Sequence, residues 1–161
     1  VYMAKRYNVG DIGPSGVGKV FYITDGGLHG YEAAPEDQST GSVWSDVSSM
    51  EVGGTGAEIG TGSANTLAII IQEYHTTSAA QICVNYRASE EGDWFLPSRD
   101  ELAELFSNID AAVGNFTVDK YWSSSESSQN IAIGLYYNGS SGAEFEDSKG
   151  TSCRVRAIRA F

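Results

Sequence analysis

The C-terminal segment, residues 121–161, contains the stretches that decide the fold. It begins with Tyr121-Trp122-Ser123-Ser124-Ser125-Glu126 and closes on Cys153-Arg154-Val155-Arg156-Ala157-Ile158-Arg159-Ala160-Phe161. Both ends combine aromatic, aliphatic and charged residues in an orderly way, whereas the residues between them are small, polar and irregular. We interpret the ends as scaffold and the middle, about residues 127–153, as a binding surface.

Residues 131–146 predict a β-hairpin. Apolar residues recur at every second position over residues 131–137, which is the period of a strand. Asn138-Gly139 is a strong hairpin-turn signal, and residues 143–146 are the expected return strand.

The same alternation assigns the side chains of this hairpin to two faces. Leu135 and Tyr137 fit the core face, so Gly134 and Tyr136 are expected to point outward. An exposed Tyr among Ser, Gly and Asn has the composition of a ligand-binding surface, because it joins a rigid aromatic anchor to small adaptable polar groups.

The clearest helix is predicted directly after Pro97. Ser98 is its expected cap and Glu101 completes a capping box. Four apolar residues then follow at helical spacing, namely Leu102, Leu105, Phe106 and Ile109.

Two earlier helices are predicted with their own caps. Ser63 is the expected cap of a helix over residues 64–74, whose apolar face contains Leu67, Ile70, Ile71 and Tyr74. Ser78 and Gln81 form a capping-box pattern before a second face made of Ala79, Ile82, Cys83 and Tyr86.

The N-terminal region contains a sequence that fits the spacing of a phosphate-binding P-loop, Gly13-Pro14-Ser15-Gly16-Val17-Gly18-Lys19. A P-loop needs a hydroxyl residue after the Lys and a helix that begins there. Here Val20 follows the Lys, and residues 20–24 predict a strand. We therefore interpret the motif as a glycine turn that leads into a strand.

Residues 28–62 have little regular patterning, and Trp44 is their expected buried anchor. The carboxylates of this region show no calcium-loop pattern, so we expect a solvated loop. These carboxylates are Glu32, Glu36, Asp37, Asp46, Glu51 and Glu58. His29 and His75 lie in no metal-ligand spacing, and we expect neither a metal site nor a cofactor.

The predicted fold class is α+β, with helices in the first two-thirds and a mostly antiparallel sheet at the end. Residues 153–161 predict one last strand with Val155 and Ala157 on its buried face. The length, 161 residues, favours a single domain over residues 1–161.

Composition excludes several classes of protein. The formal net charge of −11 argues against a nucleic-acid partner. No apolar run is long enough to enter a membrane as a spanning helix. Cys83 and Cys153 are too few for a disulfide framework, although a single bridge between them stays open.

Three separated motifs resemble the domain family that includes the C-terminal domain of a collagen-like bacterial adhesin, a branch of the C-type-lectin fold. The first is Gly10-Asp11-Ile12-Gly13-Pro14 leading into residues 20–22, and the second is Asp93-Trp94-Phe95-Leu96-Pro97-Ser98. The third consists of the two ends of residues 121–161. The resemblance implies a C-type-lectin-like fold with two to three helices.

The same ending is used by variable proteins of diversity-generating retroelements, of which the phage major tropism determinant is a more distant relative. The resemblance implies that adenine errors in Asn codons diversify the middle of the segment, while Gln129, Glu144, Glu146 and Lys149 cannot arise from such codons. The departures are Ile133 and Ala157, where the family commonly has Trp and Pro. The expected ligand-binding positions are Asn130, Ile131, Gly134, Tyr136, Asn138, Ser140, Ser141, Phe145, Asp147, Ser148, Gly150, Thr151 and Ser152.

We therefore expect a non-enzymatic module that binds a protein or a surface glycan and is exposed on a virion or cell surface or secreted. One alternative is an adhesin domain of the same fold that is not diversified. A remote alternative is an enzyme of the formylglycine-generating type, which would need reactive cysteines where this chain has only Cys83 and Cys153. The oligomeric state stays open.

Overall fold

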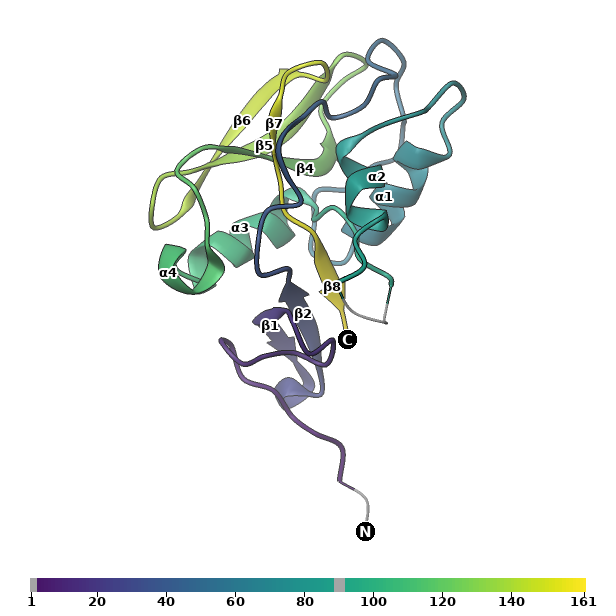
Figure 1. The fold of residues 1–161 in the computed structure, drawn as a ribbon. Helices are drawn as coiled ribbons and strands as arrows, with labels where there is room; N and C mark the ends of the chain where they lie inside the picture. Colours follow the sequence, from purple (N-terminus) through teal and green to yellow (C-terminus); the bar gives the residue numbers. More distant parts are fainter. Residues whose placement is uncertain (1–2, 89–91) are drawn as a thin grey trace.

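The computed structural model describes residues 3–88 and 92–161. Its elements in chain order are β1 Lys19–Thr24, the 3-10 helix η1 Asp25–Gly27, β2 His29–Ala33, β3 Ser39–Ser42, α1 Gly62–Ile70, α2 Ala79–Val84, α3 Arg99–Asn108, α4 Ala111–Gly114, β4 Lys120–Glu126, β5 Ile131–Tyr137, β6 Gly142–Ser148, β7 Cys153–Val155 and β8 Ile158–Ala160 (Figure 1).

The strands form two sheets. β1, β2 and β8 make a small antiparallel sheet near the two chain ends, and the larger sheet has the order β3-β7-β4-β5-β6 (Figure 1). Among the strand pairings of the described residues, only β4 with β7 is parallel. The predicted α+β class with mostly antiparallel strands is confirmed.

The predicted order of helices and strands is wrong in one respect. Residues 28–62, expected to be a loop, contain β2 and β3, which precede the helices. Both strands are short, and they pair with β8 and β7 from the end of the chain. Such long-range pairing leaves no local period in the sequence, although Trp44 is completely buried as predicted.

The last strand is also divided. Residues 153–161 form β7 in the large sheet and β8 in the small sheet, with Arg156 and Ala157 between them. Val155 and Ala157 are buried as predicted, but Arg156 and Ile158 are buried too. The segment is enclosed on both sides because it joins the two sheets.

Helix α3 matches its prediction. The Ser98 hydroxyl accepts from Glu101 N, and the Glu101 carboxylate accepts from Ser98 N, which completes the capping box. All four predicted apolar residues are buried. Phe106 lies at the centre of an aromatic cluster, with ring centroids 5.0 Å from Phe116, 5.2 Å from Tyr121 and 4.8 Å from Tyr137.

Helix α1 differs from its prediction. It ends at Ile70, Ser63 lies inside it rather than at the cap, and its buried side chains are Asn65, Thr66 and Ile69. The polar side of α1 packs against the core because Asn65 forms hydrogen bonds with the backbone of Gly56 and the hydroxyl of Ser124. Thr66 forms hydrogen bonds with the backbone of Leu96. The expected apolar face instead leaves Leu67, Ile71 and Tyr74 exposed.

The remaining helices need smaller corrections. Ser78 caps α2 by accepting from Gln81 N, but the Gln81 amide bonds Asn85, so only half of the predicted box forms. A fourth helix, the single turn α4, exceeds the expected two to three and is capped by Asp110.

The P-loop-like motif is a glycine turn before β1, as predicted. Gly13 N donates to Gly18 O, and the turn encloses the carboxylate of Glu32, which accepts from Ser15 and lies 3.3 Å from Arg159. Glu32 is completely buried, so the expectation that it is a solvated carboxylate is wrong.

Candidate ligand-binding surface

The register of β4, β5 and β6 sorts their side chains onto two faces. Trp122 pairs with Gly134, and Gly134 pairs with Phe145 across the hairpin. Paired residues and their second neighbours share a face. One face, which we call the outer face, therefore contains Lys120, Trp122, Ala132, Gly134, Tyr136, Ala143, Phe145 and Asp147.

The opposite, inner face is core. Leu135 is 3% exposed and Tyr137 is 0% exposed, and both belong to the cluster around α3. Tyr121 from β4 packs on the same cluster. The prediction that Leu135 and Tyr137 face the core is confirmed.

The outer face presents two aromatic side chains around a cation. Tyr136 is 40% exposed, and Phe145 is partly buried against Trp122 with ring centroids 5.8 Å apart. Lys120 Nζ lies 4.9 Å from the Phe145 centroid and 3.3 Å from Asp147 Oδ2. The buried Trp122 supports this group because its indole N–H donates to Ser42 O from β3.

Polar residues hold the carboxylate of Asp147 in place. Thr151 Oγ1 donates to Asp147 Oδ1 at 2.9 Å, and Ser148 N donates to the same oxygen at 2.8 Å. These hydrogen bonds, with Lys120 beside them, lower the pKa of Asp147. The carboxylate is therefore charged near neutral pH.

Ten of the thirteen expected ligand-binding positions form three groups in space. Tyr136, Phe145, Asp147 and Thr151 lie together at the outer face. Asn138, Ser140 and Ser141 lie at the exposed tip of the hairpin, where Gly139 has a φ of +104°. Asn130, Ser148 and Gly150 are exposed at the other end, about 25 Å from the tip at about 3.3 Å per strand residue. Ser152 is exposed beside Gly41, next to β3.

Two expected positions do not fit the surface. Gly134 is buried, and a Cβ there would overlap the Tyr121 carbonyl oxygen and the Phe145 ring. Gly134 lies on the outer face as expected, but it is not available to a ligand because the Phe145 ring covers it. Ile131 is only partly exposed, and by register it lies opposite Ser148 on the inner face.

Two of the four residues that cannot arise from adenine errors in Asn codons, Gln129 and Lys149, hold the edges of the surface. The Lys149 side chain is 0% exposed, and its ammonium pairs with Glu126 at 2.5 Å and donates to the carbonyls of Met50 and Gln129. Gln129 Nε2 donates to Ser49 O at 2.6 Å. These bonds tie the loop after β4 to the loop before α1.

The Ser123-Ser124-Ser125 run is buried, which confirms that this end of the segment is scaffold. Ser123 Oγ donates to Ile133 O, and Ser125 Oγ donates to Gly56 O. Each hydroxyl therefore replaces a backbone partner that a buried strand or loop would otherwise lack.

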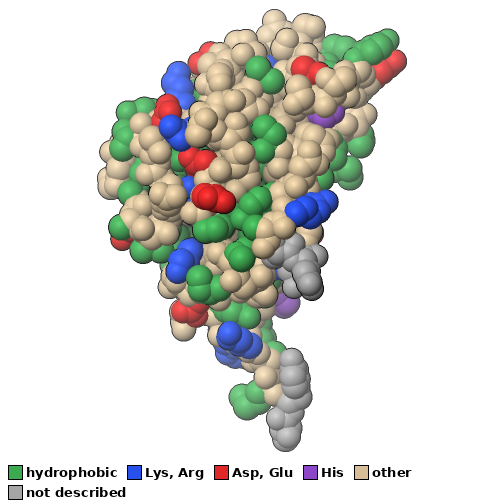
Figure 2. All heavy atoms as spheres, viewed as in Figure 1, with side chains coloured by type: hydrophobic (Ala, Val, Ile, Leu, Met, Phe, Trp, Pro, Cys, Tyr) green, Lys and Arg blue, Asp and Glu red, His purple; other side chains and the backbone are tan. Residues whose placement is uncertain are grey.

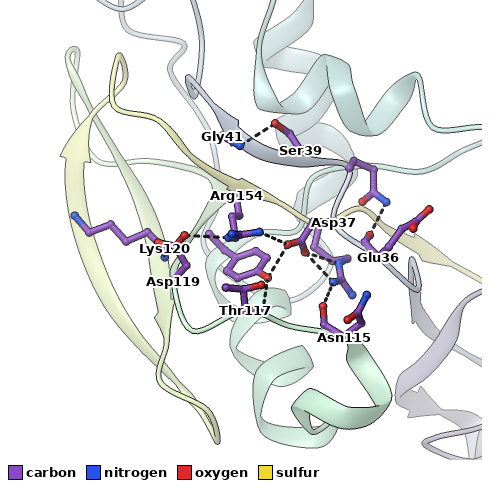
Figure 3. Close-up of polar contacts among 12 residues, drawn as sticks. Glu36, Asp37, Ser39, Gly41, Asn115, Thr117, Asp119, Lys120 and Arg154 are labelled. Atoms are coloured by element: carbon purple, nitrogen blue, oxygen red, sulfur yellow. Dashed lines mark hydrogen bonds and ion pairs between the residues drawn. The ribbon is translucent and has the colours of Figure 1, made fainter.

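The Asp37 carboxylate lies beside Arg154 and links the segment before β3 to the C-terminal arginines (Figure 3). It accepts from Arg156 Nη2 at 2.7 Å, Arg154 Nη1 at 3.2 Å and the Tyr121 hydroxyl at 3.0 Å. The expectation of a solvated Asp37 is wrong, since its side chain is 9% exposed. Burial raises the pKa of Tyr121 to about 12, so its hydroxyl stays a donor.

Arg156 is the most fully bonded cation of this network. Its side chain is 0% exposed, and it also donates to the carbonyls of Ala34, Gly114 and Asn115. Arg154 also bonds Asp119, because its Nε donates to Asp119 Oδ2 at 2.9 Å (Figure 3). Arg154 and Arg156 therefore have a structural role, because they hold the C-terminal segment to distant parts of the fold.

Both cysteines are free and buried, so the open question of a bridge is answered by two separate thiols. Burial raises the pKa of Cys153 to about 12 and raises the pKa of Cys83 further. A thiol that resists deprotonation is a poor nucleophile and a poor metal ligand.

Other features of the described surface bear on the class of partner. Figure 2 shows Lys and Arg side chains scattered singly among polar and acidic ones on the face in view. Over residues 3–88 and 92–161, no three or more His, Cys, Asp and Glu side chains gather as a metal-binding group. No helix within those ranges is long and apolar enough to span a membrane.

Sequence reasoning missed Lys120 and the supporting role of β3. Lys120 precedes the irregular segment, so its place among Tyr136, Phe145 and Asp147 depends on strand register. The alternation of β4 could have placed Lys120 on the face of Trp122, but not opposite Tyr136.

The two sheets and the helices that flank them define an α+β domain compatible with a C-type-lectin-like scaffold. The chain belongs to the Lcl C-terminal domain family, whose model matches residues 34–159. This membership makes it an adhesin-like C-terminal domain. No curated protein matches the chain.

Proposed function

We propose that this domain is a ligand-binding module whose outer face, with the loops at its edges, recognises a protein or a surface glycan. We further propose that it acts while exposed on a cell or virion surface or after secretion, as expected for an adhesin. It needs no catalytic group or cofactor for this role.

The observation that carries the proposal is the outer face itself. Tyr136 and Phe145 are aromatic side chains held on a sheet whose other face packs Tyr121, Leu135 and Tyr137 against the core. Rigid aromatic anchors lose little conformational entropy on binding and dominate the energetics of many interfaces. The polar groups of Lys120, Asp147 and Thr151 lie beside them and can give direction to a bound ligand.

We also propose that residues about 127–153 are diversified by a retroelement. Of the expected variable positions, all but Gly134 are at least partly exposed. By contrast, Gln129 and Lys149, which adenine errors in Asn codons cannot produce, make the bonds that hold the loops. This division would let the surface change while the scaffold persists.

Sequencing the 3′ end of the gene across clones tests the diversification. Substitutions should be confined to template-adenine positions and should spare Gly134, Gln129 and Lys149. A uniform sequence across clones would leave the alternative, an adhesin domain of the same fold with a constant face.

A binding experiment tests the role of the outer face separately. Ligands are first identified on a glycan array and on intact cells, and affinity is then compared for Tyr136→Ala/Phe145→Ala and the wild type. We expect at least a ~10-fold loss, the scale of losing hot-spot anchors. Tyr74→Ala is the matched control, because Tyr74 is 76% exposed on the loop after α1. Equal affinity of the double variant and the wild type would reject the outer face as the binding surface.

The buried thiols count against the formylglycine-generating alternative. That chemistry needs an accessible, reactive cysteine, whereas Cys83 and Cys153 are both buried with raised pKa values. Native thiol labelling with a disulfide reagent should be far slower than labelling in urea. Fast native labelling of both thiols would revive the enzyme hypothesis.

A further inference from the structure

We propose that Lys120 forms an anion-binding subsite at the centre of the outer face and that Asp147 occupies this subsite from within the chain. The inference rests on the proposed function of the outer face and names one class of ligand for it. The ligand is a partner protein that presents a carboxylate, and the residue at position 147 decides whether the subsite is open.

The position of Lys120 suits a constant anchor. It lies on β4, before the segment expected to vary, and it pairs directly with Tyr136 in the register of β4 and β5. Its ammonium is 3.3 Å from Asp147 and 4.9 Å from the Phe145 centroid, and its side chain is 44% exposed. A ligand that covers the two aromatic side chains would therefore meet this cation.

Asp147 is the one carboxylate recorded in an ion pair with Lys120 within the described chain. Asp119 is adjacent, but its Oδ2 accepts from Arg154 and its Oδ1 accepts the backbone N–H of Lys120. Glu144 and Glu146 alternate with Phe145 and Asp147, so they belong to the opposite face. Removing the charge of Asp147 would therefore take away the ion-pair partner of the Lys120 ammonium and leave Asp119 as a weaker neighbouring charge.

The pair is weak enough to be replaced. Asp147 and Lys120 are both partly exposed, and exposed ion pairs contribute little to stability because water screens them. A ligand carboxylate could then take the position of the Asp147 carboxylate, with Thr151 Oγ1 as a second donor. Asp and Asn codons differ by one adenine change, so diversification at this position would switch the neighbour of Lys120 between a charged and a neutral side chain.

The charge of the whole chain favours a carboxylate on a protein over a dense polyanion. A formal net charge of −11 repels a heavily sulfated chain over its full length, whereas a single carboxylate on a mostly neutral partner meets only the local cation. We therefore assign the subsite to an acidic side chain of a partner protein.

The test uses an end-blocked triglutamate peptide as the probe and follows the backbone amides of Tyr136 and Phe145 by NMR. The proteins are the wild type, Asp147→Asn and Asp147→Asn/Lys120→Met, with an end-blocked triglutamine peptide as the neutral probe. Glu73→Gln is the charge-matched control, because it removes one negative charge from an exposed side chain beyond α1.

We expect Asp147→Asn to bind the triglutamate peptide about five-fold more tightly than the wild type, the size of one exposed charge pair. The gain should vanish in the double variant and be absent from Glu73→Gln and from the triglutamine titration. The inference is overturned if Asp147→Asn gains nothing, if the double variant keeps the gain, or if dextran sulfate shows the gain and the peptide does not. The peptide titration tests the Lys120 subsite alone. The proposed function is tested separately, by the affinity of Tyr136→Ala/Phe145→Ala for the natural ligand, so failure of one can be distinguished from failure of the other.

Discussion

The two faces of β5 differ although they are made from alternate residues of one strand. On the inner face Leu135 and Tyr137 pack against α3 and are buried, whereas on the outer face Tyr136 is 40% exposed. A side chain on the inner face touches protein on every side, so its shape is constrained by close packing. On the outer face of β5, Ala132 and Gly134 are buried as well, and Tyr136 is the side chain that meets solvent or a ligand. Its identity is therefore less constrained by packing.

The largest expected effect tests the buried ion pair between Arg156 and Asp37. Arg156→Ala should destabilise the domain by about 3–5 kcal/mol, since it leaves the buried Asp37 without its closest partner. At this chain length that corresponds to a fall in Tm of roughly 6–20 °C. Thermal unfolding followed by circular dichroism measures it, and Arg99→Ala, which removes a partly exposed arginine, is the control. A change in Tm no larger than that of the control would contradict the structural role of Arg156.

Substitutions at two neighbouring residues test most directly whether the two faces of β5 differ. Leu135→Ala should cost about 2–5 kcal/mol because it leaves a cavity in the cluster around α3. Tyr136→Ala should cost under about 1 kcal/mol, as expected for a partly exposed side chain. Urea unfolding of the two variants gives both numbers, and equal losses would mean that the faces are not distinct.

A substitution at Gly134 tests whether this buried position of the outer face can accept a side chain. Gly134→Ala should destabilise by about 1–3 kcal/mol, because the added methyl group meets the Tyr121 carbonyl oxygen and the Phe145 ring. Gly150→Ala is the matched control, since the nearest atom there is Ser148 Oγ at 3.7 Å. Removing the Phe145 ring as well should not restore stability, because the carbonyl remains. Equal urea midpoints for the two Gly variants would show that Gly134 can vary after all.

The smallest expected effect concerns the pH dependence of the Asp147 pair. The pKa of Asp147 is lowered in the folded state, chiefly by the Thr151 hydroxyl, so its contribution is present above the unfolded value of about 3.9. That contribution is lost as the pH falls through the lowered folded value. Asp147→Asn should therefore unfold at slightly lower urea than the wild type at pH 7, and the difference should shrink by pH 3. A difference that grows on acidification would contradict the lowered pKa.

Local patterns predicted the elements whose signals are contiguous. The capping box and spacing of α3, the first strand, the β5–β6 hairpin and the buried pair Leu135 and Tyr137 all follow from neighbouring residues. Helix α1 was predicted with the wrong buried face, because Asn65 and Thr66 dock through hydrogen bonds to Gly56, Ser124 and Leu96. Apolar periodicity carries no information about such bonds.

The proposed binding surface is predicted from the sequence as a region and less so as a set of residues. Irregular, small and polar composition located residues 127–153, and resemblance to a family suggested why. Lys120 was missed and Gly134 was wrongly included, since both outcomes depend on which residue of a neighbouring strand lies opposite. Whether the positions vary and what they bind stays a prediction.

By itself, the sequence determined the α+β class, the scaffold character of both ends of residues 121–161 and the alternation that gives β5 two faces. These depend on side-chain period and on caps, which are properties of adjacent residues. Only the tertiary structure decided that β2 and β3 pair with the end of the chain, that Arg156 is enclosed with Asp37, and that Phe145 covers Gly134. Those contacts join residues far apart in sequence, so they exist only once the sheets are assembled and the side chains compete for the same space.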